Sequence, residues 1–307
     1  MPQSRRRFLR NLGLSAAALM LPDRLDAAAP LAAGPTTADR ERLAAWLRTL
    51  RREGLPPRGG LGRAIGRVGQ LALDTPYRAH TLEEYLVAGG APRAEPATCY
   101  LTVFDCVTLV ESAQGVARTA AKPNGGWNDF VHEIERMRYR GGVREGYTSR
   151  LHYFSEWITD NARRGLVRDL GPELGAVDDA RPLRFMSTHR GAYPALSDDA
   201  THDAIVQMEK RLDAHPRHLV PTERIPGVMD RIHTGDVLAF ATSVEGLDAS
   251  HTGLAYRDRA GVLRVLHAPL SGGAVTISRG DLHAYVAGIR RSTGVMVARP
   301  LQARPEQ

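Results

Sequence analysis

Cysteine, lysine and long apolar runs are all scarce in this sequence, and each scarcity excludes a class of protein. Cys99 and Cys106 are the only cysteines among 307 residues, too few for a framework of disulfide bonds. After residue 29 no stretch approaches the ~20 apolar residues that a membrane-spanning helix needs. Hydrophobic residues still make up 43% of the chain, so we expect a well-packed core without stable membrane insertion.

Lysine is nearly absent, because Lys122 and Lys210 are the only two and arginine supplies the other positive charges. The formal net charge is +7, but the arginines are interleaved with acids and form no basic tract. No set of aromatic residues accompanies them, which argues against a nucleic-acid partner. A mildly basic surface would suit an anionic polymer such as the cell wall.

The first residues have the order of an export signal. Residues 4–10, SRRRFLR, resemble a twin-arginine signal, and the short apolar run NLGLSAAALML follows them. Small residues at 27–29 would suit signal peptidase. We therefore set residues 1–29 apart as a signal peptide. We expect residues 30–307 to form a single domain that acts in the periplasm.

Helical and strand patterns occupy different parts of the chain. Apolar residues at helical spacing predict helices within 36–54, 106–120, 127–139 and 149–165, whereas 167–203 is irregular and polar. After Pro226, alternating residues predict strands in GDVLAFATS, SHTGLAYRD, VLRVLHAP, GAVTIS and TGVMVARP. Helices first and an antiparallel sheet afterwards indicate the α+β class.

Cys106 lies in the stretch VFDCVTLVES, directly before a predicted helix. Asp105 is well placed as the N-cap of that helix. The free N–H groups and positive dipole end of a helix favour thiolate over thiol, which makes Cys106 a candidate nucleophile. The alternative is structural, because Cys99 and Cys106 could pair in an oxidising compartment.

Two histidines near the C-terminus are the candidate partners of this cysteine. His251 begins HTGLAY and His267 lies in VLHAP. If these segments pair across a turn at 257–261, both rings can lie on one face of the sheet. Packing the helix of Cys106 against that sheet would align thiolate, imidazole and imidazole, with His251 as general base and His267 orienting it.

Two other kinds of site fit the sequence less well. The same cysteine and two histidines could bind zinc, but no HExxH or paired CxxC motif supports a metal site. A serine hydrolase would need a GxSxG motif at its nucleophile, and the sequence has none. We therefore expect neither a metal nor another cofactor.

These motifs resemble the NlpC-type branch of papain-like cysteine peptidases. That family has Asp-Cys at a helix start, a His-x-Gly strand, and a third polar residue on the next strand. Five residues match in order: Asp105, Cys106, His251, Gly253 and His267. Over about residues 60–300, the chain more closely resembles a former domain-of-unknown-function group, the N-acetylmuramoyl-L-alanine amidase-like branch. The stretches that carry this likeness are TPYRAHTLEEY, FDCVTLVES, SRLHYFSEWITDNARRG and GLDASHTGLAY.

The resemblance implies a papain-like core, in which an antiparallel sheet packs on a helix with the catalytic cysteine at its N-terminus. Cys106 and His251 are far apart for a plain NlpC core, which implies an inserted helical lobe at about 121–225. Val107 and Thr108 replace the Ser-Gly of the commoner NlpC pattern, a departure that favours the amidase-like branch.

Further site residues follow from the same resemblance. Tyr77 resembles a tyrosine whose hydroxyl helps to hold the substrate carbonyl, and with the Cys106 N–H it could form an oxyanion site. Ordinary loop packing is the alternative for Tyr77. Asp105 could bind substrate as well as cap its helix. Arg150 and Tyr153 could contact sugar or peptide, or pack as a helix face against the sheet.

The resemblance also implies a reaction without a cofactor. A cysteine amidase of this branch cleaves the amide between N-acetylmuramic or anhydromuramic acid and L-alanine, and it favours small muropeptides over intact wall. The rival within the class cuts between D-glutamate and diaminopimelate in the stem peptide. The alternative of another class is a non-catalytic cell-wall-binding module with a disulfide. We expect a monomer whose partners are peptidoglycan fragments.

Overall fold

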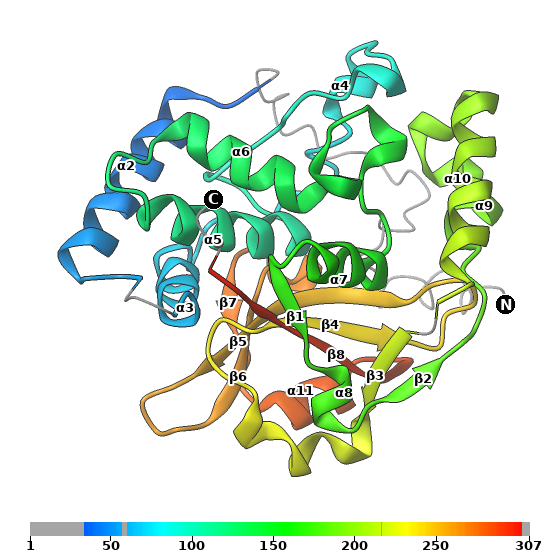
Figure 1. Ribbon diagram of the computed structural model, residues 1–307. Helices are drawn as coiled ribbons and strands as arrows, with labels where there is room; N and C mark the ends of the chain where they lie inside the picture. The colour runs from blue at the N-terminus through cyan, green and yellow to red at the C-terminus, as the bar shows by residue number, and fades with distance from the viewer. Residues whose placement is uncertain (1–33, 57–59, 216, 303–307) are drawn as a thin grey trace, which may run out of the picture.

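The computed structural model describes residues 34–56, 60–215 and 217–302, so the predicted signal peptide lies outside the described residues (Figure 1). The longer helices are α2 (Thr37–Arg52), α3 (Gly62–Leu71), α5 (Cys106–Ala120), α6 (Trp127–Arg138), α7 (Phe154–Arg163), α10 (Asp199–Leu212) and α11 (Leu282–Gly288). Three helices have one turn each: α4 (Glu84–Val87), α8 (Gly171–Leu174) and α9 (Phe185–Thr188). In the parts of the chain that the structure describes, no helix is both long and apolar enough to cross a bilayer.

The strands form one antiparallel sheet in the order β2-β3-β8-β4-β5-β6-β7, and β1 also pairs with β8. Their bounds are β1 (Val167–Asp169), β2 (Val177–Asp179), β3 (Arg217–Pro221), β4 (Val237–Thr242), β5 (Ala249–Arg257), β6 (Leu263–His267), β7 (Thr276–Ile277) and β8 (Ser292–Pro300). The hairpin of β5 and β6 closes where Arg257 pairs with Leu263. The predicted α+β class with an antiparallel sheet is confirmed.

Helices cover both faces of this sheet, as Figure 1 shows. Alternate residues of β4 face opposite ways, as the period of a strand requires. Val237 and Ala239 join a large core with α2, α3, α5, α6 and α7. Leu238 and Phe240 join a second core with α11 and the turns around Ile225. The sheet therefore separates two apolar layers.

Helix α5 is the centre of the larger layer. It packs against β5, α2, α3 and α6, and all of its residues except Val107 are buried. A Cβ on Gly115 would lie 2.9 Å from Ile134 Cδ1, so the glycine lets α6 approach closely. The sequence predicts that this helix has a single apolar face. In the structure it is buried on nearly all sides, as a helix in a protein core is. This burial fixes the position of its first residue, Cys106.

Residues 121–225 differ from the helical lobe that the sequence predicts. They contain α6, α7 and α10, but they also supply β1, β2 and β3. Two of these strands, β1 and β3, pair directly with β8. Strands β1 and β2 have three residues each, too few to show a period-2 pattern. Pairing with distant strands, rather than a local pattern, forms them.

Candidate active site

Cys106 is the first residue of α5 and is 1% exposed. Asp105 precedes it in extended conformation, and its Oδ1 accepts a hydrogen bond from Thr108 N at 2.7 Å. The Thr108 hydroxyl accepts in turn from Asp105 N at 2.9 Å, which completes a capping box. Asp105 is thus the N-cap that the sequence predicts. The sulfur lies at the positive end of the helix, where a thiolate is favoured.

The two cysteines do not form a disulfide, and both Cys99 and Cys106 are buried thiols. Burial raises the pKa of the Cys99 thiol to about 11, and the nearby Arg138 guanidinium opposes this rise. Cys99 is therefore a protonated core residue at neutral pH. A buried cysteine of this kind is chemically inert.

His251 on β5 and His267 at the end of β6 lie side by side. His251 Nε2 is 2.7 Å from His267 Nδ1, and the ring centroids are 5.0 Å apart. The hairpin brings the two histidines together as its predicted pairing requires. Both side chains are buried, so the contact between them is shielded from water.

Aromatic rings enclose this histidine pair. Phe240 of β4 lies opposite His251 in the sheet register and stacks on it, with centroids 5.6 Å apart. The ring of Tyr285 on α11 packs against Phe240, with ring centroids 5.2 Å apart. Its hydroxyl oxygen lies 3.1 Å from His267 Nδ1. The pair therefore lies between the Phe240 ring of β4 and the Tyr285 side chain of α11.

Cys106 reaches the same part of the sheet from α5. The Thr252 hydroxyl donates to the backbone carbonyl of Cys106 at 3.1 Å, which joins the helix start to the strand residue next to His251. Burial raises the pKa of Tyr285, and the nearby charge of a Cys106 thiolate raises it further. The sulfur is thus within electrostatic reach of the tyrosine that contacts His267.

Burial also sets the charge of both imidazoles. It lowers the pKa of His267 to about 4. It lowers the pKa of His251 well below the ordinary value of 6.5, and the neighbouring His267 lowers it further. Both rings are therefore neutral at pH 7, and a neutral imidazole can accept a proton.

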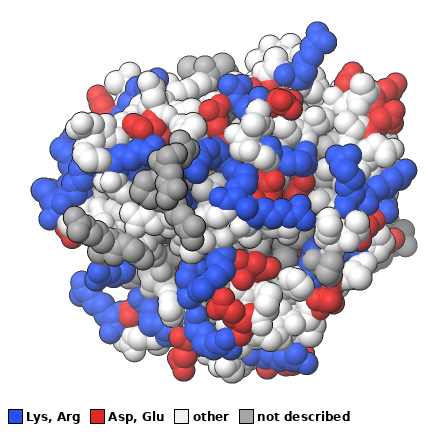
Figure 2. All heavy atoms as spheres, in the orientation of Figure 1, with Lys and Arg blue, Asp and Glu red and all other residues white. Residues whose placement is uncertain are grey.

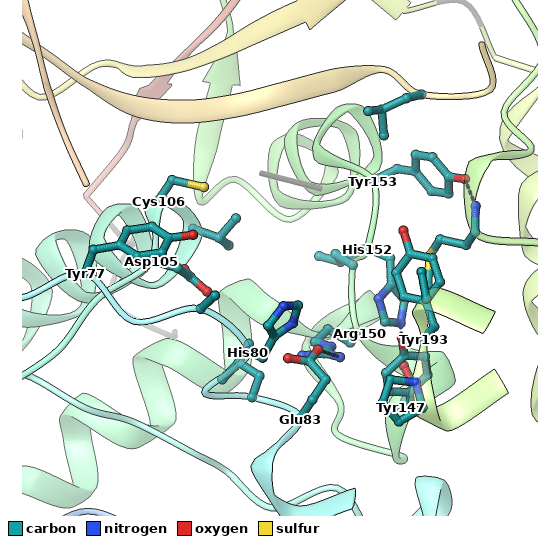
Figure 3. Close-up of a pocket in the computed structure, with 18 residues that line it drawn as sticks. Tyr77, His80, Glu83, Asp105, Cys106, Tyr147, Arg150, His152, Tyr153 and Tyr193 are labelled. Carbon is teal, nitrogen blue, oxygen red and sulfur yellow. Dashed lines mark hydrogen bonds and ion pairs between the residues drawn. The ribbon is translucent and has the colours of Figure 1, made fainter. Parts of the chain in front are cut away.

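A pocket opens beside Cys106, and Figure 3 shows the residues that line it. Cys106, Tyr77 and Asp105 lie at one end. The other end is rich in aromatic and imidazole rings; its labelled residues are Tyr147, Arg150, His152, Tyr153 and Tyr193. His80 and Glu83 lie between the two ends. The pocket thus extends from the sulfur to a group of aromatic and imidazole rings.

Backbone pairing holds Tyr77 at the cysteine end. Its amide donates to Gly273 O at 2.8 Å, and it forms a parallel bridge with Phe104. In Figure 3 its hydroxyl points toward Asp105 and Cys106. Burial raises the pKa of Tyr77 above its ordinary value of 10.0, and the charges of Cys106 and Asp105 add to the rise. The phenol therefore keeps its proton and can act as a donor.

Arg150 and Tyr153 lie at the far end of the pocket, and their polar groups are engaged within the protein. Arg150 Nη2 donates to Glu83 Oε1 at 2.6 Å, and Nε lies 3.6 Å from Glu95 Oε1. The Tyr153 hydroxyl donates to the buried Glu209 at 2.7 Å. These contacts make both residues parts of the pocket wall, and they are not gathered around the sulfur with Tyr77.

Sequence reasoning missed several residues of the site. Tyr285 follows a predicted strand without a motif of its own, and only Asp281, the N-cap of α11, marks its helix. Tyr193 lies in the stretch that the sequence predicts to be irregular. His80 lies in TPYRAHTLEEY, and its backbone has a φ of 60°. A left-handed non-glycine residue cannot be recognised from its neighbours alone.

Within the described ranges, no group of three or more His, Cys, Asp or Glu side chains could hold a metal ion. The imidazole contact and the pocket beside a helix N-terminus are features of a site for nucleophilic chemistry on a carbonyl group.

Known proteins resemble this chain in sequence and in fold. The family model AmiA-like, described as N-acetylmuramoyl-L-alanine amidase-like, matches residues 67–294. The solved structure of an N-acetylmuramoyl-L-alanine amidase from Bacteroides uniformis is 28% identical with a TM-score of 0.72, covering 79% of this chain and 99% of that one. A Bacteroides fragilis protein, for which a xylanase function has been suggested, is 32% identical with a TM-score of 0.69, covering 76% and 99%.

A more distant structure shows the fold alone. This Legionella pneumophila protein, of family model DUF1460, is 18% identical with a TM-score of 0.63, covering 87% of this chain and 96% of that one. No curated protein matches the chain.

Proposed function

Because the chain belongs to the AmiA-like family, the N-acetylmuramoyl-L-alanine amidase-like proteins, we propose that it is a cysteine-dependent peptidoglycan amidase. The bond cleaved is the amide between N-acetylmuramic or anhydromuramic acid and L-alanine of the stem peptide. The observation that supports this most is the 2.7 Å contact between His251 and His267, beside the helix that begins at Cys106. A buried imidazole pair next to a helix-terminal cysteine suits acyl transfer.

Cys106 is the nucleophile of the first step. Its sulfur attacks the lactyl carbonyl carbon, and its proton passes to His251 Nδ1, because Nε2 already contacts His267. The Cys106 N–H and the Tyr77 hydroxyl donate to the oxygen that becomes negative. His251 then gives the proton to the nitrogen of L-alanine as the C–N bond breaks, leaving a muramoyl thioester on the sulfur.

Water completes the reaction. His251 takes a proton from the attacking water, whose oxygen bonds to the thioester carbon. As the C–S bond breaks, His251 returns this proton to the departing Cys106 sulfur. The products are the lactyl carboxylic acid and a peptide with a free L-alanine amine. His267 holds the His251 ring in place through both steps, and the chemistry requires no redox partner.

The residues that line the pocket support a muropeptide as substrate. Its aromatic far end, which includes Tyr193, suits sugar or peptide groups placed beyond the scissile bond. Asp105, half-buried beside the sulfur, could accept a hydrogen bond from the peptide. We propose that the protein acts in the periplasm, exported by the twin-arginine signal at residues 4–10.

Three other functions receive less support. Cleavage between D-glutamate and diaminopimelate uses the same residues and would change only how the peptide lies in the pocket. A glycosidase needs two available carboxyl groups. Of the carboxylates in the pocket, Glu83 pairs with Arg150 and Asp105 caps α5. A disulfide-stabilised binding module is not supported, because neither cysteine is in a disulfide.

Digestion of a defined disaccharide-tetrapeptide, followed by mass measurement of the products, tests the proposal. Free disaccharide and free tetrapeptide are expected; a dipeptide left on the sugar would identify the endopeptidase instead. Cys106→Ala should abolish cleavage and leave the fold intact. The matched control is Cys99→Ala, which removes the other buried thiol and should leave cleavage in place. Cleavage by Cys106→Ala would contradict the mechanism.

A further inference from the structure

The Tyr285 hydroxyl contacts the histidine pair at the same nitrogen that His251 uses. His267 Nδ1 lies 2.7 Å from His251 Nε2 and 3.1 Å from the Tyr285 oxygen. One ring nitrogen thus has two hydrogen-bonding neighbours. A neutral imidazole nitrogen carries either one proton or one lone pair, so the two neighbours constrain which form is present.

Only one arrangement gives both short contacts a proton of their own. If His267 Nδ1 is bare, it accepts from His251 Nε2–H and from the Tyr285 hydroxyl. If Nδ1 carries the proton, it donates well to one neighbour, and the other contact loses its hydrogen bond or shares that proton. An unmade hydrogen bond in a buried site costs free energy. The bare nitrogen is therefore favoured.

The consequence extends from His267 to His251. When His267 Nδ1 accepts, His251 Nε2 must carry its ring proton. The neutral ring then has a lone pair on Nδ1, the nitrogen that serves as base in the proposed mechanism. In the opposite arrangement His251 Nδ1 would hold a proton and could not accept another from the Cys106 thiol.

We propose that Tyr285 is a positioning residue that selects the tautomers of His267 and His251 by donating its hydroxyl proton to His267 Nδ1. This inference rests on the proposed function for its catalytic meaning, although the tautomers themselves can be measured without substrate. The Tyr285 ring also contacts Phe240 and His267, with centroids 5.2 Å and 4.9 Å away, so the hydroxyl is held rather than free to turn aside.

The direct test is the nitrogen NMR spectrum of the full-length protein with ¹⁵N-labelled histidine, because the bare and the protonated ring nitrogens resonate far apart. Comparison with His267→Asn assigns the two rings. We expect His251 and His267 in the wild type each to carry the proton on Nε2. A wild-type spectrum with the proton on His267 Nδ1 would overturn the proposal, whatever any variant does.

Tyr285→Phe supplies the second measurement, since it removes the hydroxyl and keeps the ring. We expect the His267 signals to move toward a mixture of tautomers. We also expect kcat to fall about fivefold, the factor that one ordinary hydrogen bond supports, with KM within about twofold. The matched control is Tyr256→Phe, which removes a hydroxyl bonded to Gln70 at 2.7 Å and should leave the histidine signals unchanged. Unchanged tautomers in Tyr285→Phe would also contradict the proposal.

The two proposals can fail separately. A protein that does not cleave the muropeptide, but has both histidines protonated on Nε2, would contradict the proposed function and leave the tautomer selection by Tyr285 standing. A protein that cleaves the muropeptide but carries the proton on His267 Nδ1 would support the proposed function and contradict the tautomer selection by Tyr285.

Discussion

Gly253 and His267 lie on neighbouring strands with no room for a side chain between them. A Cβ on Gly253 would stand 3.1 Å from His267 Cβ and 2.9 Å from Val265 Cγ1. Both distances are shorter than ordinary carbon contacts. The glycine of the HTG motif therefore sets the spacing of the hairpin that carries both histidines.

Gly253→Ala should accordingly lower activity by moving β6. A shift of His267 by a few tenths of an ångström lengthens its contact with His251, and misplaced catalytic groups are costly. We expect kcat to fall about tenfold or more. The control is Gly288→Ala, where the added methyl meets open space, and which should keep full activity. Equal activity in the two variants would contradict this role of Gly253.

Replacing His267 separates orientation from proton transfer. Asn can place an oxygen near the former position of Nδ1 and still accept from His251, whereas Ala cannot. We expect His267→Ala to lower kcat about 10²-fold or more, and His267→Asn to retain several times more activity than Ala. The measurement is steady-state cleavage of the muropeptide. Equal losses would show that His267 does more than accept a hydrogen bond.

The pH dependence of kcat/KM should follow the buried state of His251. The reaction requires the neutral imidazole, and burial keeps that form down to a pH well below 6.5. Activity should therefore persist as the pH falls through 6.5, and the acid limb should lie lower. An acid limb at or above this value would mean that the folded protein does not lower the pKa of His251.

Tyr77→Phe tests the second donor of the oxyanion site. Removing one such donor typically costs about 10²-fold in kcat. The ring remains in place, so we expect KM to change little. Tyr256→Phe serves again as the control, because the Tyr256 hydroxyl on β5 accepts a hydrogen bond from Gln70 of α3. An undiminished kcat in Tyr77→Phe would assign Tyr77 to packing alone.

The stability of the helix that carries Cys106 depends on a buried ion pair. Arg138 Nε donates to Glu111 Oε2 at 2.7 Å, and both side chains are almost fully buried. Glu111→Ala would leave the guanidinium without its carboxylate, and we expect a loss of about 3–5 kcal/mol in unfolding free energy. Glu53→Ala breaks the half-exposed pair with Arg67 and should cost less than about 1 kcal/mol. Denaturant titration distinguishes these two results.

The sequence was informative where local chemistry determines structure. Asp105 caps its helix by a side-chain contact three residues away, and the hairpin of β5 and β6 follows from alternating residues around a turn. Short-range patterns of this kind need no knowledge of the rest of the chain. These patterns were enough to predict that His251 and His267 lie close together.

Features that depend on distant partners could not be predicted. Tyr285 meets His267 only because α11 folds back over the sheet, and no spacing in the sequence encodes that return. Glu83 faces Arg150 across 67 positions of the chain. The strands β1 and β3 both pair with β8, which lies far along the chain from either of them. Each of these features depends on packing between residues far apart in the sequence, which local sequence patterns do not show.

The place of β8 in the sheet has a consequence for biosynthesis. This strand, the last along the described residues, lies between β4 on one side and β1 and β3 on the other. A growing chain cannot join these two parts of the sheet until residue 300 has left the ribosome. Assembly of the whole sheet therefore has to wait for β8, and nascent chains that stop short of β8 would expose its unpaired neighbours.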